Sequence, residues 1–64
     1  MRELPPVDTV IKLIENHVSN LINFSIINMQ YTNSDTLKVV FKVLNKNNRL
    51  FVVYFNQKEI ENVR

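Results

Sequence analysis

The side chains best suited to chemistry in this sequence are basic and aromatic residues of its C-terminal half. Four basic residues lie in a stretch, residues 36–56, that contains no acidic residue: Lys38, Lys42, Lys46 and Arg49. Basic side chains neutralise phosphates and aromatic rings stack on bases, so a sheet that presents both together can bind single-stranded nucleic acid. These four residues, with Phe51 and Phe55 beside them, are therefore candidate nucleic-acid contacts.

Catalysis and metal binding are not indicated by the remaining polar residues. The acidic residues are few and none of them pairs within a predicted strand: Glu3, Asp8, Glu15, Asp35, Glu59 and Glu61. His17 is the single histidine, cysteine is absent, and the lack of glycine excludes the glycine-rich loops that cradle phosphates. Because catalysis needs convergent acid, base or nucleophile groups, we predict no enzyme, no catalytic residue, no metal, no cofactor and no small-molecule substrate.

Hydrophobic periodicity predicts one helix followed by three strands. An N-terminal arm, residues 1–6, ends in two prolines, after which a helix can begin. Apolar residues then recur at helical spacing: Val7, Val10, Ile11, Ile14, Val18, Leu21 and Ile22. The period next changes to two in three β-rich runs: residues 24–31, 36–44 and 49–56.

Short connections between these runs imply antiparallel neighbours. Residues 32–35 and 45–48 are rich in Asn, Asp and Ser, whose side chains bond to nearby backbone, and asparagine tolerates positive φ. The tail, residues 57–64, has Ile60 and Val63 at the spacing of a short C-terminal helix. The sequence therefore predicts an α+β fold, in which one N-terminal helix packs on a three-stranded antiparallel meander sheet (α-β-β-β).

The predicted element order resembles that of double-stranded RNA-binding domains, in order alone. That family's glycines, and the lysine cluster at the start of its last helix, have no match here, where residues 57–61 read Gln-Lys-Glu-Ile-Glu. No site residue is therefore carried over from that family.

Size and composition favour association with another chain. The 45% hydrophobic and 22% charged residues are typical of a soluble globular protein, so residues 1–64 are predicted to form one small domain. A core of this size rarely contributes more than about 3 to 5 kcal/mol, and no disulfide can add to it. We expect a cytoplasmic protein without a membrane partner, because no apolar leader and no apolar run of ~20 residues is present.

Strict alternation assigns the strand residues to two faces, given that Tyr31 opposes Leu37 and that Val43 opposes Leu50 or Val52. One face is expected to receive the helix: Ile27, Met29, Tyr31, Leu37, Val39, Phe41, Val43, Leu50, Val52 and Tyr54. The second face carries seven apolar residues, which are the candidate protein interface: Phe24, Ile26, Val40, Leu44, Phe51, Val53 and Phe55.

The seven apolar side chains of the second face require a cover, because a half-exposed antiparallel sheet normally carries polar residues there. Their burial is worth on the order of 10 kcal/mol before association costs are subtracted. The cover is, in order of preference, a second copy of the chain, a larger protein, or the chain's own tail. The sequence thus predicts a non-enzymatic protein-interaction module that forms a homodimer or binds a larger protein partner.

Two further expectations accompany this prediction. Ten asparagines, six isoleucines and five lysines indicate an AT-rich coding genome, such as that of a Firmicute, a phage or an archaeal virus. A small chain of this composition fits an accessory protein of a phage or mobile element that acts on a host factor in the host cytoplasm. The alternative function is single-stranded DNA or RNA binding by the basic and aromatic face of the hairpin formed by the second and third strands.

Overall fold

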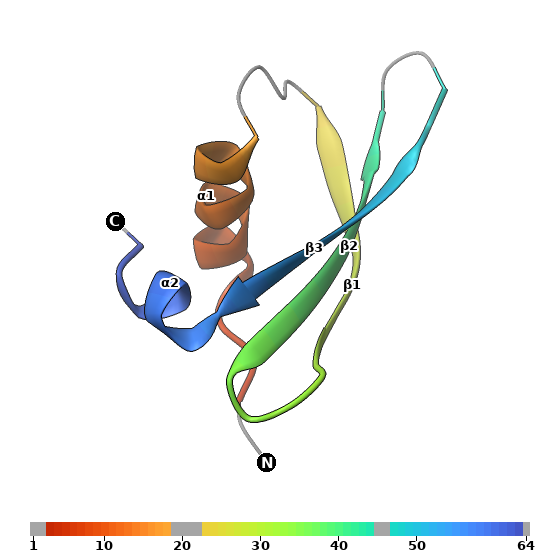
Figure 1. Cartoon of the computed structure of the whole chain (residues 1–64). Coiled ribbons are helices and arrows are strands. Elements are labelled where there is room, and N and C mark those ends of the chain that lie inside the picture. The colour runs from red at the N-terminus through yellow and green to blue at the C-terminus, as the bar shows by residue number, and fades with distance from the viewer. Residues whose placement is uncertain (1–2, 19–22, 45–46, 64) are drawn as a thin grey trace.

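A computed structural model of the protein describes residues 3–18, 23–44 and 47–63. Its elements follow in this order: α1 (Val7–His17), β1 (Phe24–Tyr31), β2 (Thr36–Val43), β3 (Leu50–Asn56) and α2 (Gln57–Glu61). The strands form one antiparallel sheet in the order β1-β2-β3, and both helices lie on the same side of it (Figure 1). The predicted α-β-β-β fold with a short C-terminal helix is confirmed.

Helix α1 begins directly after Pro6, whose carbonyl oxygen accepts a hydrogen bond from the Val10 N–H at 3.2 Å. Its buried residues are Val10, Leu13 and Ile14. The helix ends at His17, and Val18 is already extended, so the helix is shorter than the predicted apolar stripe. Valine and histidine are weaker helix formers than the leucine and lysine that precede them, which favours an end at this point. The expected stripe residues Leu21 and Ile22 lie outside the described residues.

The two connections of the sheet use asparagine as predicted. In the first, the Asp35 N–H donates to the Asn33 side-chain oxygen at 2.8 Å, and the Thr32 N–H donates to the Thr36 carbonyl oxygen at 2.9 Å. In the second, Asn48 adopts φ 48°, in the left-handed region that asparagine tolerates. Both connections thus close antiparallel hairpins without glycine.

Helix α2 is fixed to the end of β3 by a capping box. The Asn56 side-chain oxygen accepts from the Glu59 N–H at 2.9 Å, and the Glu59 carboxylate accepts from the Asn56 N–H at 3.2 Å. This cap aims Ile60 into the core, where it is buried, and Val63 packs beside it. The tail therefore covers the helix side of the sheet and leaves the opposite side open.

The core lies between the sheet and the two helices. In the described part of the chain, its buried side chains come from both helices and from β2 and β3: Val10, Leu13, Ile14, Leu37, Val39, Phe41, Phe55 and Ile60. Among the described residues, none of those on the opposite side of the sheet is buried. We call that opposite side the outer face.

A bulge in β1 corrects the predicted faces of that strand. One extra residue, Ile27, is inserted between Ile26 and Asn28, so side chains from both halves of the strand reach the core side. The β1 side chains that pack against the core are Phe24, Ile26, Met29 and Tyr31. The prediction is thus wrong for Phe24 and Ile26, which it places on the second face, and for Ile27, which is 54% exposed.

The pairing of β2 with β3 also differs from the prediction, by one residue relative to Leu50 and by three residues relative to Val52. Val43 pairs with Arg49, whose carbonyl oxygen accepts from the Val43 N–H at 2.9 Å, rather than with Leu50 or Val52. A shift by an odd number of residues exchanges the two sides of a strand. The β3 residues that face the helices are therefore Phe51, Val53 and Phe55, and those on the outer face are Leu50, Val52 and Tyr54.

Candidate protein-interaction surface

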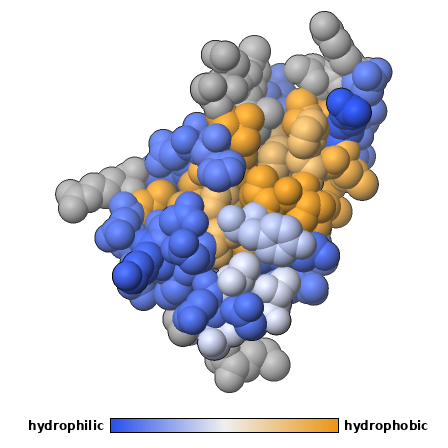
Figure 2. All heavy atoms as spheres, viewed as in Figure 1, coloured by the Kyte–Doolittle hydropathy of each residue, from blue (hydrophilic) through white to orange (hydrophobic). Residues whose placement is uncertain are grey.

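Strand β3 carries the largest concentration of exposed apolar side chains in the described part of the chain. Four of its residues, which we call the β3 surface, are exposed at these fractions: Leu50 61%, Phe51 41%, Val52 49% and Tyr54 56%. Figure 2 shows apolar side chains gathered over the middle of the molecule, beside the polar surface of the helices. Contiguous exposed apolar residues of this kind mark interaction sites on soluble proteins.

The backbone of β3 has one free side. In the described part of the chain β3 pairs only with β2, and it crosses in front of β2 in Figure 1. Hydrogen bonds at both ends of the hairpin, from the Gln57 N–H to the Asp35 carbonyl (2.8 Å) and from the Val43 N–H to the Arg49 carbonyl, fix the ladder pattern. Because hydrogen-bonded pairs alternate along an antiparallel ladder, the odd-numbered residues of β3 bond to β2.

The even-numbered residues of β3 consequently direct their N–H and C=O groups away from the sheet. These residues are Leu50, Val52, Tyr54 and Asn56, and the first three also belong to the β3 surface. Unpaired backbone groups and exposed apolar side chains therefore occur on the same residues. This combination is a template for the addition of another strand.

The β3 edge lacks the features that normally protect such an edge. No charged residue, proline or glycine lies between Leu50 and Asn56, and the pairing with β2 contains no bulge. The other edge strand, β1, has the Ile27 bulge, which locally disrupts the pattern that a further strand would need. The two edges of the sheet are therefore not equivalent as binding surfaces.

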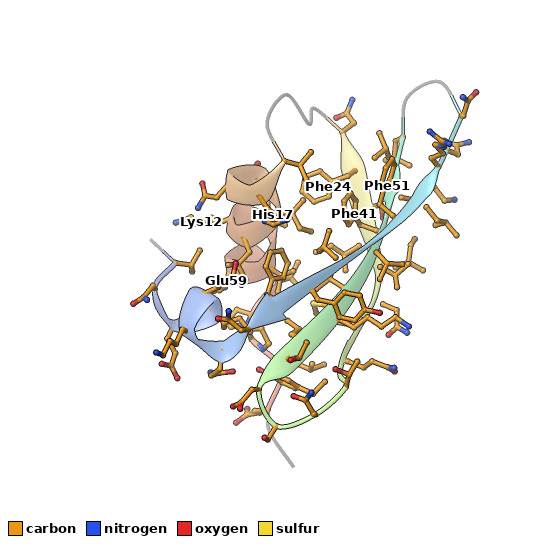
Figure 3. The ribbon with its side chains drawn as sticks, viewed as in Figure 1. Lys12, His17, Phe24, Phe41, Phe51 and Glu59 are labelled. Carbon is orange, nitrogen blue, oxygen red and sulfur yellow. The ribbon has the colours of Figure 1, made fainter. Side chains whose placement is uncertain are left out.

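An aromatic cluster supports the start of β3. The Phe51 ring stacks on Phe41, with ring centroids 5.7 Å apart and an interplanar angle of 16°. Phe24 meets Phe41 edge to face at 5.6 Å, and Figure 3 shows the three rings together beside the top of α1. Because Phe41 is buried, it holds the exposed Phe51 ring in a fixed position on the surface.

The seven predicted interface residues do not share a face. Phe55 is 1% exposed and belongs to the core, where its ring meets His17 edge to face at 5.7 Å. Four others also lie on the helix side, three half-buried and one exposed: Phe24, Ile26, Val53 and Phe51. Val40 is half-buried on the outer face, and Leu44 is exposed beyond the end of β2. Phe51 is thus the one residue common to the predicted interface and the β3 surface.

The β3 surface contains three residues that sequence reasoning missed, namely Leu50, Val52 and Tyr54. The predicted pairing of Val43 with Leu50 or Val52 placed them beneath the helix. The available signal is the unbroken apolar run from Leu50 to Phe55, which makes both sides of β3 apolar in any register. Which side is covered depends on the β2–β3 register.

The candidate nucleic-acid contacts are separated from the phenylalanines. Lys38 and Lys42 lie on the outer face, opposite Tyr54 and Leu50 of β3, whereas Phe51 and Phe55 lie on the helix side. Correcting the register therefore removes the expected mixture of lysine and phenylalanine from one face. The other two candidates follow β2: Arg49 is exposed next to Leu50, and Lys46 lies outside the described residues.

A shallow hollow of about 520 Å³ lies between α1 and β1. Its lining is mainly apolar and includes Leu4, Val7, Ile11 and Ile27. Within residues 3–18, 23–44 and 47–63, no three side chains of metal-binding type come together. None of the helices described is long and apolar enough to cross a membrane.

Comparisons with known protein families, with curated proteins and with solved structures found no match for this chain.

Proposed function

We propose that this protein is a non-enzymatic protein-interaction module that binds its partner along the free edge of β3. The observation that carries the proposal is the coincidence, on Leu50, Val52 and Tyr54, of exposed apolar side chains with unpaired backbone groups. A partner strand placed there gains main-chain hydrogen bonds and covers apolar surface in one step. The composition, rich in Asn, Ile and Lys, supports an accessory protein of a phage or mobile element, acting in the host cytoplasm.

The energies available at this edge are comparable with those of the protein's own core. Complete burial of an apolar side chain is worth about 1.5 to 3 kcal/mol, so four side chains that are roughly half exposed offer on the order of 3 to 6 kcal/mol. Each main-chain hydrogen bond adds about 0.5 to 1.5 kcal/mol. Association itself costs at least about 4 kcal/mol, so we expect a partner affinity of roughly tens of micromolar.

The outer face taken alone is a poorer interface than the β3 edge. Lys38 and Lys42 lie in its middle, and Ser25, Asn28 and Gln30 occupy its β1 side. A partner that covers this whole face has to bury two ammonium groups, which is costly without paired charges. A partner at the β3 edge leaves both lysines in solvent.

Two matched variants test the proposal. Val52→Lys places a charge on the β3 surface, and Ile27→Lys places the same charge at a similarly exposed position on the other edge strand. Cells that produce the tagged wild type, or either variant, are treated with a cross-linker, and covalent complexes are quantified by mass spectrometry. Circular dichroism of each purified variant checks that the fold is retained.

The proposal requires a protein complex, with itself or with another protein, that the wild type and Ile27→Lys form and Val52→Lys loses. Complexes that are unaffected by Val52→Lys, or that are lost equally in both variants, contradict it. The comparison separates the β3 edge from nonspecific adhesion of apolar surface, because the two substitutions remove similar amounts of exposed apolar area.

A further inference from the structure

We infer that the partner at the β3 edge is a second copy of this chain, paired antiparallel so that Val52 lies opposite Val52 of the second copy. The inference rests on the proposed function and specifies its partner. The two three-stranded sheets then join through β3 into one continuous sheet about a two-fold axis perpendicular to it.

The hydrogen-bonding pattern restricts the register of this pairing. Only the even-numbered residues of β3 direct their backbone groups outward, so these residues must form the hydrogen-bonded pairs between copies. A two-fold axis at Val52 pairs Val52 with itself and Leu50 with Tyr54, in both directions. Three residue pairs, each exchanging two bonds, give about six main-chain hydrogen bonds.

Neighbouring registers use the strand less well. An axis at Phe51 places Tyr54 opposite Asn48, whose positive φ has already left the strand conformation. An axis at Val53 places the exposed Leu50 opposite the polar Asn56, next to the first residue of α2. Only the axis at Val52 pairs the three exposed apolar residues of the outer face with one another. Pairs of aromatic and β-branched or aliphatic side chains across strands stabilise a sheet.

Charge also favours a second copy as the partner, rather than another protein whose strand carries charged side chains. The paired segment, Leu50–Asn56, carries no charge, so two copies approach without repulsion between their strands. Antiparallel pairing further brings Arg49, at the start of one β3, toward the α2 end of the other, where Glu59 and Glu61 outnumber Lys58. The arrangement is therefore self-complementary in charge as well as in hydrogen bonds.

Stacking of two copies through their outer faces is the competing symmetric arrangement, and the lysines disfavour it. Lys38 and Lys42 of both copies then enter one interface without an acidic residue on β1, β2 or β3 to pair with them. Edge pairing keeps all four ammonium groups on a solvated surface. Edge pairing also adds stability to a small domain that has no disulfide.

Cysteine substitution tests both the partner and the register, since the native sequence contains no cysteine. In the proposed pairing the two Val52 Cα atoms lie about 5.5 Å apart, within the range that a disulfide bridges. The two Leu50 residues are offset by four positions, roughly 14 Å along the strands, which a disulfide does not bridge. Ile27→Cys, on the other edge strand, reports random collision.

The masses of the purified wild type and of the Val52→Cys, Leu50→Cys and Ile27→Cys variants are measured by light scattering from about 5 μM to 1 mM, a range centred on the expected micromolar affinity. The three cysteine variants are then oxidised with diamide. We expect the mass of the wild type to rise from 7.6 kDa toward twice that value with concentration. We also expect Val52→Cys to form the covalent dimer at least about tenfold faster than Leu50→Cys or Ile27→Cys, because only its sulfur atoms meet.

A wild-type mass that stays at 7.6 kDa over this range overturns the second copy as partner. The proposed function is still supported if the complex that Val52→Lys abolishes in cells contains a different protein. If no such complex exists, the proposed function is contradicted as well. Equal cross-linking of Val52→Cys and Leu50→Cys overturns the register. If only the Ile27→Cys variant forms covalent dimers, self-association occurs through the β1 edge and the inference is overturned.

Discussion

Truncation of Phe55 tests the register on which the β3 surface depends. Phe55 and Tyr54 are adjacent aromatic residues of similar size, and their exposed fractions are 1% and 56%. Phe55 lies opposite Leu37 in the ladder, and its ring packs against His17 of α1. A shift of one residue in the pairing of β2 and β3 exchanges the environments of the two side chains.

The expected effects of the two truncations differ severalfold. Phe55→Ala removes a fully buried ring and should lower the free energy of unfolding by about 3 to 5 kcal/mol. A core of this size contributes roughly that amount in total, so the variant should be largely unfolded at 25 °C. Tyr54→Ala changes an outer-face side chain that makes no core contact, and should cost below about 1 kcal/mol.

Urea denaturation followed by circular dichroism measures these differences. Protein concentrations of about 1 μM keep self-association from contributing to the Tyr54→Ala result, because mass action weakens it at low concentration. Since Phe55→Ala leaves little folded protein, Phe55→Leu serves as the quantitative variant. It keeps most of the buried volume, and we expect a loss of about 1 kcal/mol, or roughly 4 to 8 °C in Tm.

The β2–β3 register described above is refuted if Tyr54→Ala destabilises the protein more than Phe55→Ala or Phe55→Leu does. That result places Tyr54 in the core and Phe55 on the surface, as the predicted pairing of Val43 with Leu50 or Val52 implies. The β3 surface described above is then wrong.

Three further predictions follow from the same geometry. Val52→Pro removes an outward-facing N–H and should leave the monomer folded while abolishing self-association. Val53→Pro instead breaks a hydrogen bond to β2 and should cost about 1 to 3 kcal/mol. Urea denaturation and light scattering measure both effects. Asn56→Ala removes the cap of α2 and should lower the unfolding free energy by about 1 kcal/mol in a thermal melt, and an unchanged Tm argues against the cap. For a labelled single-stranded oligonucleotide, fluorescence anisotropy should give a Kd no tighter than about 10⁻⁴ M at 0.15 M salt. Tight binding that Lys42→Glu abolishes contradicts the placement of the lysines and phenylalanines on opposite sides of the sheet.

Local interactions explain why the element order could be predicted. The spacing of Val10 and Ile14 repeats at the helical period, and the β-branched run from Leu37 to Val43 alternates, so each pattern reports its own segment. Asn33 and Asn48 form the turns with their own side chain or backbone. None of these assignments depends on what another part of the chain does.

The candidate interface could not be predicted in the same way, because apolar residues occupy both sides of β3. For β2, whose lysines alternate with apolar residues, the sequence identifies the outer face, and the positions of Lys38 and Lys42 agree with it. For β3, residues 50–55 are apolar throughout, so composition alone does not distinguish its sides.

The sequence by itself determined that this protein is a helix followed by an antiparallel meander and a short C-terminal helix, because periodicity and turn chemistry act within a few residues. Only the tertiary structure decided which apolar residues remain outside. The Ile27 bulge moves one half of β1 by a single residue, and the pairing of Val43 with Arg49 moves β3 by one residue relative to Leu50 or by three relative to Val52. A shift by an odd number of residues exchanges the faces of a strand. Those shifts depend on how two hairpins and the helices pack together, since the apolar run of β3 fits either register.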